Sequence, residues 1–128
     1  MKGESQKRHA RKRQREEDVK KISGWRIMWT WVTYDLPTKT DEDKARYRIF
    51  HNILLDMGFD MLQFSVYARP SPNEEVAEAL GRQLQKQIPI YGRVRIFRLT
   101  DKQFGEMKVF EGKKQVETEN APQQLTFF

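Results

Sequence analysis

The sequence predicts an α+β fold, in which strands and helices alternate around one antiparallel sheet. A long apolar run at residues 25–34 opens the folded part, and two segments with apolar residues at helical spacing follow it. Runs rich in β-branched and aromatic residues lie between and behind these segments. The resulting order is βαββαβ with an additional short C-terminal strand, which is the ferredoxin-like arrangement. Because both helices pack on one face, the other face must meet solvent, nucleic acid or a second subunit.

The first predicted strand covers Trp25 to Tyr34 and ends at Asp35, shortly before Pro37. Its residues are apolar on both alternating faces, which is typical of a central strand. Asp35 is therefore expected where the chain leaves the sheet, a place at which ligands and metal ions are often held. The local pattern alone favours a plainer interpretation, an aspartate that forms a turn or caps a helix.

The first helix is predicted over Asp41 to Met57. Thr40 and Asp43 have the spacing of a capping box, and Gly58 is placed to close the helix with a left-handed residue. Its apolar stripe consists of Ile49, Phe50, Ile53, Leu54 and Met57. The following segment, Phe59 to Arg69, is too short for an ordinary helix and predicts two short strands or one bent strand.

A second capping box at residues 71–74, with Pro72 at the first helical position, predicts a helix that Pro89 ends. Its apolar stripe consists of Val76, Ala77, Leu80, Leu84 and Ile88. The strand expected over Gly92 to Leu99 has a core face with Val94 and Ile96, and its opposite face carries Arg93, Arg95 and Phe97. After a turn over residues 100–105, a last short strand is expected over residues 107–110.

Composition limits the class of protein. A chain of 128 residues holds at most one compact domain plus tails. Cysteine is absent, which excludes disulfides, zinc–thiolate sites and cysteine nucleophiles. No apolar stretch approaches the ~20 residues of a membrane span, and the basic N-terminus lacks the apolar core of a signal peptide. We therefore expect a soluble cytoplasmic protein.

Positive charge is concentrated in the first 24 residues, which hold nine Lys or Arg against four acids and so carry +5 of the net +6. A basic arm attracts phosphates regardless of base sequence, although a disordered leader or an upstream start codon explains the composition equally well. The expected organisation is a basic, disordered leader over 1–24, a ferredoxin-like domain over 25–112 and a polar tail over 113–128.

Three segments resemble the CRISPR-associated protein 2 family, also called CRISPR-associated endoribonuclease 2, in the version found in type II systems. They are YDLP at Tyr34 to Pro37, GFDMLQFSVYAR at Gly58 to Arg69 and RIFRLTDKQFG at Arg95 to Gly105. YDLP alone is weakly specific, but the three segments occur in the right order and at the right spacing. The resemblance covers Trp25 to about Gly112. The basic leader departs from the family pattern, so nothing is carried over to it.

The resemblance implies a two-fold dimer of ferredoxin-like subunits whose sheets face each other, with the last strand added to the partner's sheet. It also implies a role in CRISPR adaptation, the acquisition of spacers, in a prokaryotic cytoplasm. There the dimer bridges dimers of the integrase, CRISPR-associated protein 1, and holds the incoming double-stranded DNA fragment. Family members are also assigned a metal-dependent endonuclease activity on single-stranded RNA or duplex DNA. The aspartate that ends the first strand binds the metal, so here the resemblance makes Asp35 the catalytic and Mg²⁺-binding residue.

One carboxylate per subunit makes a poor magnesium site, whereas two copies across a dimer axis can share one ion. Ser65 could complete the shell if its strand lies beside the first, although a plain strand residue is the simpler interpretation. His9 lies in the leader and His51 on the first predicted helix, where a surface or helix-flanking role is the default. No general base is evident, so hydrolysis would depend on metal-bound water, and a purely structural role is equally compatible with these residues.

A scaffold for arbitrary DNA fragments must contact phosphates rather than bases. The candidates for these contacts are the basic residues Lys44, Arg46, Arg48, Arg69, Arg93, Arg95 and Arg98. Each one alone is equally explained as a solvated charge or an ion-pair partner, as the spacing of Glu42 and Arg46 illustrates. Arg93 and Arg95 have the further alternative of lining the subunit interface.

Two other functions stay open. A stand-alone, metal-dependent ribonuclease of the toxin-like type shares this fold and would also use Asp35. An RNA-binding module of the RRM type needs a Gly–aromatic–Gly–Phe–Val pattern on the third strand, and LQFSVY at Leu62 to Tyr67 resembles it only loosely.

The C-terminal end gives a separate hypothesis. Leu125, Phe127 and Phe128 follow a polar stretch and resemble the anchors of a short docking peptide. Docking onto the integrase is the more economical interpretation. The segment also looks somewhat like the sliding-clamp-binding peptides of bacteria, and packing against the chain's own sheet is the plain alternative.

We expect deletion of residues 125–128 to weaken assembly with the integrase and to leave the dimer folded, because these apolar anchors end a polar tail. Co-purification of the truncated protein with the integrase measures this effect. Unchanged co-purification would reject the docking hypothesis.

Overall fold

The computed structural model describes residue 11 and residues 27–119 of the chain. The expectations for the rest of the leader, for the start of the first strand at Trp25, and for Leu125, Phe127 and Phe128 lie outside the described residues. Within the described part, no helix combines the length and the apolar character needed to cross a lipid bilayer.

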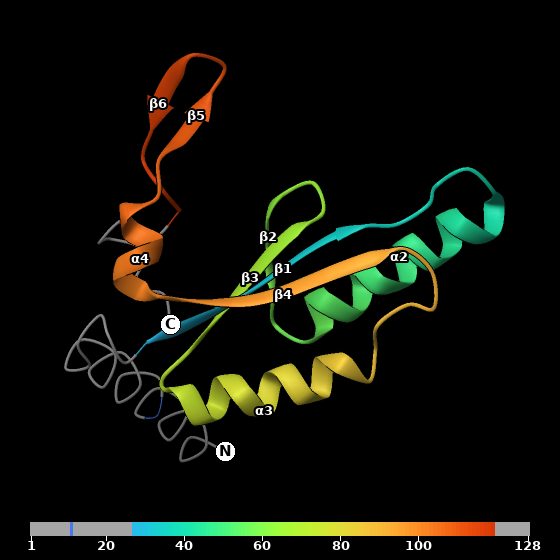
Figure 1. Cartoon of the computed structure of the whole chain (residues 1–128), viewed down its shortest axis with the longest axis horizontal. Coiled ribbons are helices and arrows are strands. Elements are labelled where there is room, and N and C mark those ends of the chain that lie inside the picture. The colour runs from blue at the N-terminus through green and yellow to red at the C-terminus, as the bar shows by residue number, and fades with distance from the viewer. Residues whose placement is uncertain (1–10, 12–26, 120–128) are drawn as a thin grey trace, which may run out of the picture.

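The elements follow the predicted order, with two additions near the C-terminal side. They are β1 (Met28–Asp35), α2 (Asp41–Asp56), β2 (Asp60–Gln63), β3 (Val66–Ser71), α3 (Glu74–Gln85), β4 (Arg93–Thr100), α4 (Asp101–Glu106), β5 (Val109–Glu111) and β6 (Lys114–Val116). Strands β1 to β4 form one antiparallel sheet in the order β2-β3-β1-β4. Helices α2 and α3 lie on the same side of this sheet (Figure 1). The predicted α+β fold with ferredoxin-like order is thereby confirmed.

Strand β1 is central in the sheet, because β3 pairs with one of its edges and β4 with the other. Val32 and Tyr34 belong to the cluster that packs against the helices, whereas Trp29 and Trp31 belong to a cluster on the opposite face. All four side chains are buried. The central position inferred from an apolar run on both faces is therefore confirmed.

The larger hydrophobic cluster lies between the sheet and the two helices. Phe50 and Leu54 from α2 and Leu80 and Leu84 from α3 enter it at helical spacing. Three residues predicted for these stripes are instead exposed: Ile49, Val76 and Ile88. Helix α3 ends at Gln85, before Ile88 is reached.

We call the sheet face opposite to α2 and α3 the open face. A smaller hydrophobic cluster covers one end of it. Phe104 from α4 packs against Trp29 with ring centroids 4.7 Å apart, and the Trp29 indole N–H donates to an Asp101 carboxylate oxygen at 2.8 Å. The turn expected over residues 100–105 is thus a short helix, which Thr100 caps. Part of the open face is consequently buried within the single chain.

Beyond α4, the single short strand expected over residues 107–110 is a hairpin of β5 and β6, with Gly112 at a φ of +64° in the turn. Figure 1 shows this hairpin extending away from the four-stranded sheet. It forms a separate two-stranded sheet of its own.

Helix α2 begins as predicted, with Thr40 and Asp43 each accepting a hydrogen bond from the other's backbone N–H at 3.0 and 3.2 Å. Gly58 follows at a φ of +84°, the left-handed conformation expected after a helix. Helix α3 begins differently, because Asn73 is its N-cap and accepts from the Val76 N–H at 2.9 Å. Asparagine is among the best N-caps, so Pro72 lies before the helix rather than at its first position.

Gly92 fixes how closely β4 approaches the end of β1. Its φ is +89°, and a Cβ there would lie 2.6 Å from both the Asp35 carbonyl oxygen and the Leu36 Cδ2. We expect Gly92→Ala to lower the free energy of unfolding by about 2 kcal/mol or more, because it adds backbone strain and a steric clash.

The matched control is Gly81→Ala in α3, where a Cβ would meet no atom within 4 Å. This change should leave stability unchanged or raise it by up to ~1 kcal/mol, because alanine favours a helix over glycine. Urea unfolding measures both variants. Equal stabilities of the two would contradict the role given to Gly92.

Candidate functional site

Asp35 is the last residue of β1, and its side chain is exposed. It stands directly opposite Arg93 in the register of β1 and β4. By strand alternation it lies on the same face as Trp31, whereas its neighbour Tyr34 faces the helices. The structure therefore places an accessible carboxylate at the edge of the open face, where the sequence predicted it.

Tyr34, the residue before Asp35, is fixed by hydrogen bonds and ring contacts with several elements. Tyr34 donates its hydroxyl proton to the Tyr67 hydroxyl at 3.1 Å, and its ring contacts those of Tyr47 and Phe50. Its backbone N–H donates to the Ser65 carbonyl oxygen at 3.2 Å. The end of β1, and with it the backbone of Asp35, is thus fixed from both sides of the strand.

Ser65 adopts an unusual conformation for a residue that is not glycine, with a φ of +64°. Its hydroxyl is hydrogen-bonded to the Tyr47 hydroxyl at 2.8 Å, and its carbonyl oxygen is occupied by Tyr34. Ser65 lies beside β1, which was the condition for it to join Asp35 as a metal ligand. Its hydroxyl and its carbonyl oxygen, however, are both hydrogen-bonded to tyrosines.

His51 is half-buried on α2, and its Nδ1 is hydrogen-bonded to the Tyr67 hydroxyl. His51 thus links α2 to β3 through this hydrogen bond. Burial raises the pKa of Tyr34 and of Tyr67 above the ordinary tyrosine value. Both hydroxyls consequently stay protonated near neutral pH and act as hydrogen-bonding groups on the helix side of the sheet rather than as bases.

A single chain offers few ligands for a metal ion. The described residues contain no group of three or more His, Cys, Asp or Glu side chains that could hold one. Magnesium is often bound by only one or two carboxylates, with waters and substrate phosphates completing its shell. Asp35 alone therefore fits a magnesium site only if a second carboxylate or a phosphate joins it.

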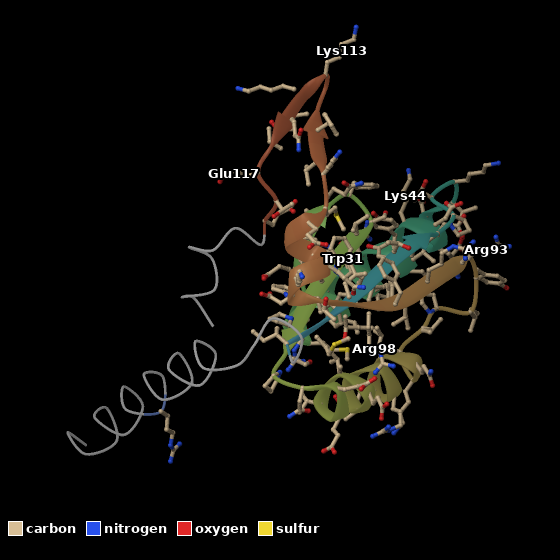
Figure 2. The ribbon with its side chains drawn as sticks, turned by 60° about the vertical axis from the view of Figure 1, so that its left-hand side comes forward. Trp31, Lys44, Arg93, Arg98, Lys113 and Glu117 are labelled. Atoms are coloured by element: carbon tan, nitrogen blue, oxygen red, sulfur yellow. The ribbon has the colours of Figure 1, made fainter. Side chains whose placement is uncertain are left out.

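The predicted basic residues separate into two groups by their contacts. Lys44 and Arg48 on α2 are exposed, and so are Arg93 and Arg95 on the open face of β4. Lys44 and Arg93 lie at the same end of the molecule (Figure 2). These four side chains have charge available at the surface around the Asp35 end of the sheet.

The remaining three predicted basic residues have partners within the chain. Arg46 pairs with Asp43 at 2.7 Å rather than with Glu42, the partner that helical spacing suggested. Arg69 donates to the Met57 carbonyl oxygen at 2.6 Å, where it supports the end of α2. Arg98 faces the carboxylates of Glu74 and Glu78 on α3, at 3.9 and 3.8 Å.

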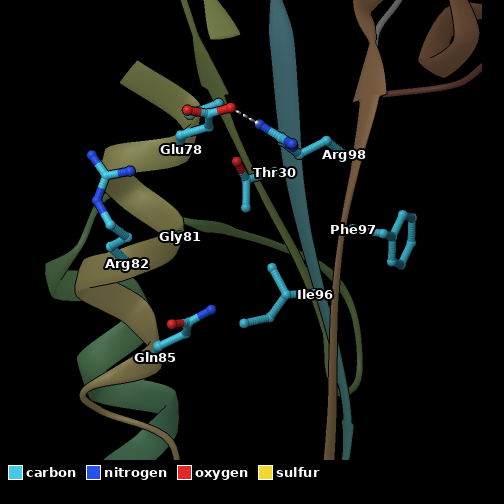
Figure 3. A pocket seen from close by; sticks show the side chains of 9 residues that line it. Thr30, Glu78, Gly81, Arg82, Gln85, Ile96, Phe97 and Arg98 are labelled. Carbon is cyan, nitrogen blue, oxygen red and sulfur yellow. Dashed lines mark ion pairs between the residues drawn. The ribbon is translucent and has the colours of Figure 1, made fainter. Parts of the chain in front are cut away.

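Arg98 also lines a cavity of about 270 Å³ between α3 and the sheet (Figure 3). Figure 3 shows Thr30 and Ile96 pointing from the strands toward α3, and Gln85 reaching toward the strands. The Thr30 hydroxyl is buried and has no hydrogen-bond partner among the described residues. The cavity lies on the helix side of the sheet, away from the open face.

Several aromatic residues near Asp35 were missed by the sequence analysis. Tyr47 precedes Phe50 by three residues, so its place on the buried stripe of α2 had a detectable signal. No sequence pattern indicated the positions of the other two rings. Phe64 stacks on Tyr47, and Tyr91 lies under the Arg46 guanidinium. Both belong to loops whose position depends on the tertiary fold.

Comparison with known proteins shows the family to which the chain is related. Residues 28–107 match the family model described as CRISPR associated protein Cas2. A relative from Flavobacterium psychrophilum, named CRISPR-associated endoribonuclease Cas2, is 39% identical over 113 residues, which are 88% of this chain and 98% of the relative. Relatives of the same name occur in Paracidovorax avenae, 38% identical over 84% of this chain and 99% of the relative, and in Parvibaculum lavamentivorans, 41% identical over 79% and 100%.

Proposed function

The chain belongs to the CRISPR-associated protein Cas2 family, and from this premise we propose that it acts in CRISPR adaptation as a two-fold dimer. The dimer holds a double-stranded DNA fragment and bridges dimers of the integrase, CRISPR-associated protein 1, that inserts the fragment into the repeat array. The observation that carries the proposal is the incompletely covered open face, with Asp35 at its edge.

The open face has the properties of a surface that a second subunit covers. The Trp31 indole N–H is buried beneath it and has no acceptor among the described residues. Phe97 stacks on Trp31 and remains 40% exposed. A facing sheet would bury the Phe97 ring and could supply an acceptor for Trp31, since buried indole donors usually find one.

The strand edges support the same assembly. Strand β4 is an edge strand, so one row of its backbone groups has no neighbour in the four-stranded sheet. The β5–β6 hairpin pairs only with itself in a two-stranded sheet, which is marginally stable alone. In the proposed dimer, the hairpin of one subunit adds to the β4 edge of the other.

Phosphate contacts are assigned to the basic residues around the dimer: Lys44, Arg46, Arg48, Arg69, Arg93, Arg95 and Arg98. Four exposed members, Lys44, Arg48, Arg93 and Arg95, are best placed to meet a duplex, whereas Arg98, also exposed, would lose its contacts with the α3 carboxylates. Such contacts suit a scaffold, because they position a DNA fragment and carry no base sequence preference.

We further propose that the dimer is a magnesium-dependent endonuclease at Asp35, which the name of the relatives, endoribonuclease, favours. Two Asp35 carboxylates near the dimer axis would supply the second ligand that one chain lacks. A bound Mg²⁺ supplies charge neutralisation at the phosphodiester and an activated water. Asp35 itself would hold the ion, and the Tyr34–Ser65 and Tyr34–Tyr67 hydrogen bonds would keep its backbone in place.

The finer assignment to type II systems rests on the resemblance of Gly58 to Arg69 and of Arg95 to Gly105, both within the matched residues. It implies that the protein works in a prokaryotic cytoplasm, beside a type II effector nuclease. Sequencing of the neighbouring genes tests the assignment, and an effector of another type there would overturn it.

We expect Phe97→Glu to convert the dimer to a monomer and to abolish integration of a duplex fragment, because it places a charge in the centre of the facing sheets. The matched control is Ile49→Glu, which alters an exposed apolar residue on the helix side. Light scattering and an integration assay with the purified integrase measure both variants. A dimeric, integration-competent Phe97→Glu protein would overturn the proposed assembly.

Asp35→Asn separates the scaffold from the nuclease. The change keeps the size of the side chain and removes the charge that attracts Mg²⁺. We expect cleavage of single-stranded RNA or duplex DNA to fall at least ~100-fold and integration to persist, because the bridge depends on phosphate contacts. Loss of both activities would instead indicate that integration needs the metal, and unchanged cleavage would exclude Asp35 as its ligand. If the protein is instead a stand-alone ribonuclease, it should cleave RNA at the same rate with and without the integrase.

A further inference from the structure

Two exposed aromatic rings near the Asp35 end of the sheet are held in fixed positions by α2. Phe64 is 75% exposed, and its ring stacks on Tyr47 with centroids 5.4 Å apart and planes 19° from parallel. Tyr91 is 55% exposed, and the Arg46 guanidinium lies 4.8 Å from its ring centroid. Each ring thus has a partner within the chain and a large remaining surface open to solvent.

Both rings come from loops that adjoin the end of β1. Phe64 precedes Ser65, whose carbonyl oxygen accepts the Tyr34 N–H directly before Asp35. Tyr91 precedes Gly92, whose backbone lies against the Asp35 carbonyl oxygen. The two loops therefore flank the same strand end from the β3 side and from the β4 side.

The rings are also accessible in the assembly proposed above. Their partners, Arg46 and Tyr47, are consecutive residues of α2, which covers the face opposite to the open face. A dimer formed through the open face leaves α2 on the outside. Phe64 and Tyr91 are thus candidates for contact with a ligand rather than with the second subunit.

The charge around these rings indicates the chemistry of the ligand. Arg46 lies on Tyr91, and Lys44 and Arg93 are exposed at the same end of the molecule. Arg48, one helical turn after Lys44 on α2, is exposed as well. Exposed aromatic faces among cations are the arrangement with which proteins bind single-stranded nucleic acid, since the rings stack on bases and the cations meet phosphates. Bases in a duplex are already stacked on each other and do not offer their faces.

We propose that Phe64 and Tyr91 bind unpaired nucleobases by stacking, and so hold a single-stranded segment of nucleic acid against α2, at the end of the molecule where β1 ends. This inference rests on the proposed nucleic-acid function and names the part of the substrate that the site would recognise. In the scaffold role, the segment is an unpaired stretch of the DNA fragment. In the nuclease role, it is a part of the single-stranded substrate outside the cleaved phosphodiester.

The test measures binding of fluorescent single-stranded DNA and RNA oligonucleotides, a strand with abasic positions, and a blunt duplex, by anisotropy with the full-length protein. We expect Phe64→Ala and Tyr91→Ala to weaken single-strand binding by roughly 5- to 100-fold each, the range for loss of one stacked base. Duplex binding should be unchanged. The abasic strand should bind the wild-type protein as weakly as the normal strand binds the variants.

Conservative and control variants separate stacking from a folding defect. Phe64→Trp and Tyr91→Phe keep an aromatic face and should retain binding, whereas Leu55→Ala, at an exposed apolar residue of α2, should have no effect. The strand, DNA or RNA, on which the loss is larger identifies the natural ligand.

Equal binding of normal and abasic strands would overturn the proposal. So would alanine variants that bind single strands normally but no longer co-purify with the integrase, because the rings would then be a protein-docking surface. Failure of the proposed adaptation function shows separately, as a Phe97→Glu protein that still integrates duplex fragments.

Discussion

The whole domain depends on burying β1 on both faces while both of its edges are hydrogen-bonded. This constraint brings two distant strands, β3 and β4, to the two sides of one central strand. The helices then cover the face with Val32 and Tyr34, and α4 covers part of the face with Trp29 and Trp31. Because β1 is held so completely, the residue at its end, Asp35, has a defined position although its own side chain is exposed.

Sequence patterns predicted the parts of this fold that local interactions determine. The apolar run of β1, the capping box at Thr40 and the alternation of β4 each depend on residues close together in the chain. The position of Asp35 followed directly from the sequence, because it depends only on where the first strand ends. The start of α3 was placed wrongly because Ser71 and Asn73 are competing caps, and Ser71 is still the last residue of β3.

The remainder of the site could not be predicted, because it is made by side chains from separate segments. The link between His51 and Tyr67, and the stacking of Phe64 on Tyr47, exist only once α2 lies across the strands. Likewise, α4 is stabilised by Trp29, more than seventy residues earlier in the chain. Arg46 illustrates the same limit at short range, since both Glu42 and Asp43 are within its reach and only geometry selects Asp43.

The placement of Trp29 and Trp31 gives the protein two internal optical reporters. Indole emission shifts with the polarity and hydrogen bonding of its surroundings. Trp29 is hydrogen-bonded to Asp101 and senses the attachment of α4, whereas Trp31 lies under Phe97 and senses what covers the sheet. In variants that keep only one of the chain's three tryptophans, assembly and loosening of α4 can therefore be followed as separate fluorescence signals.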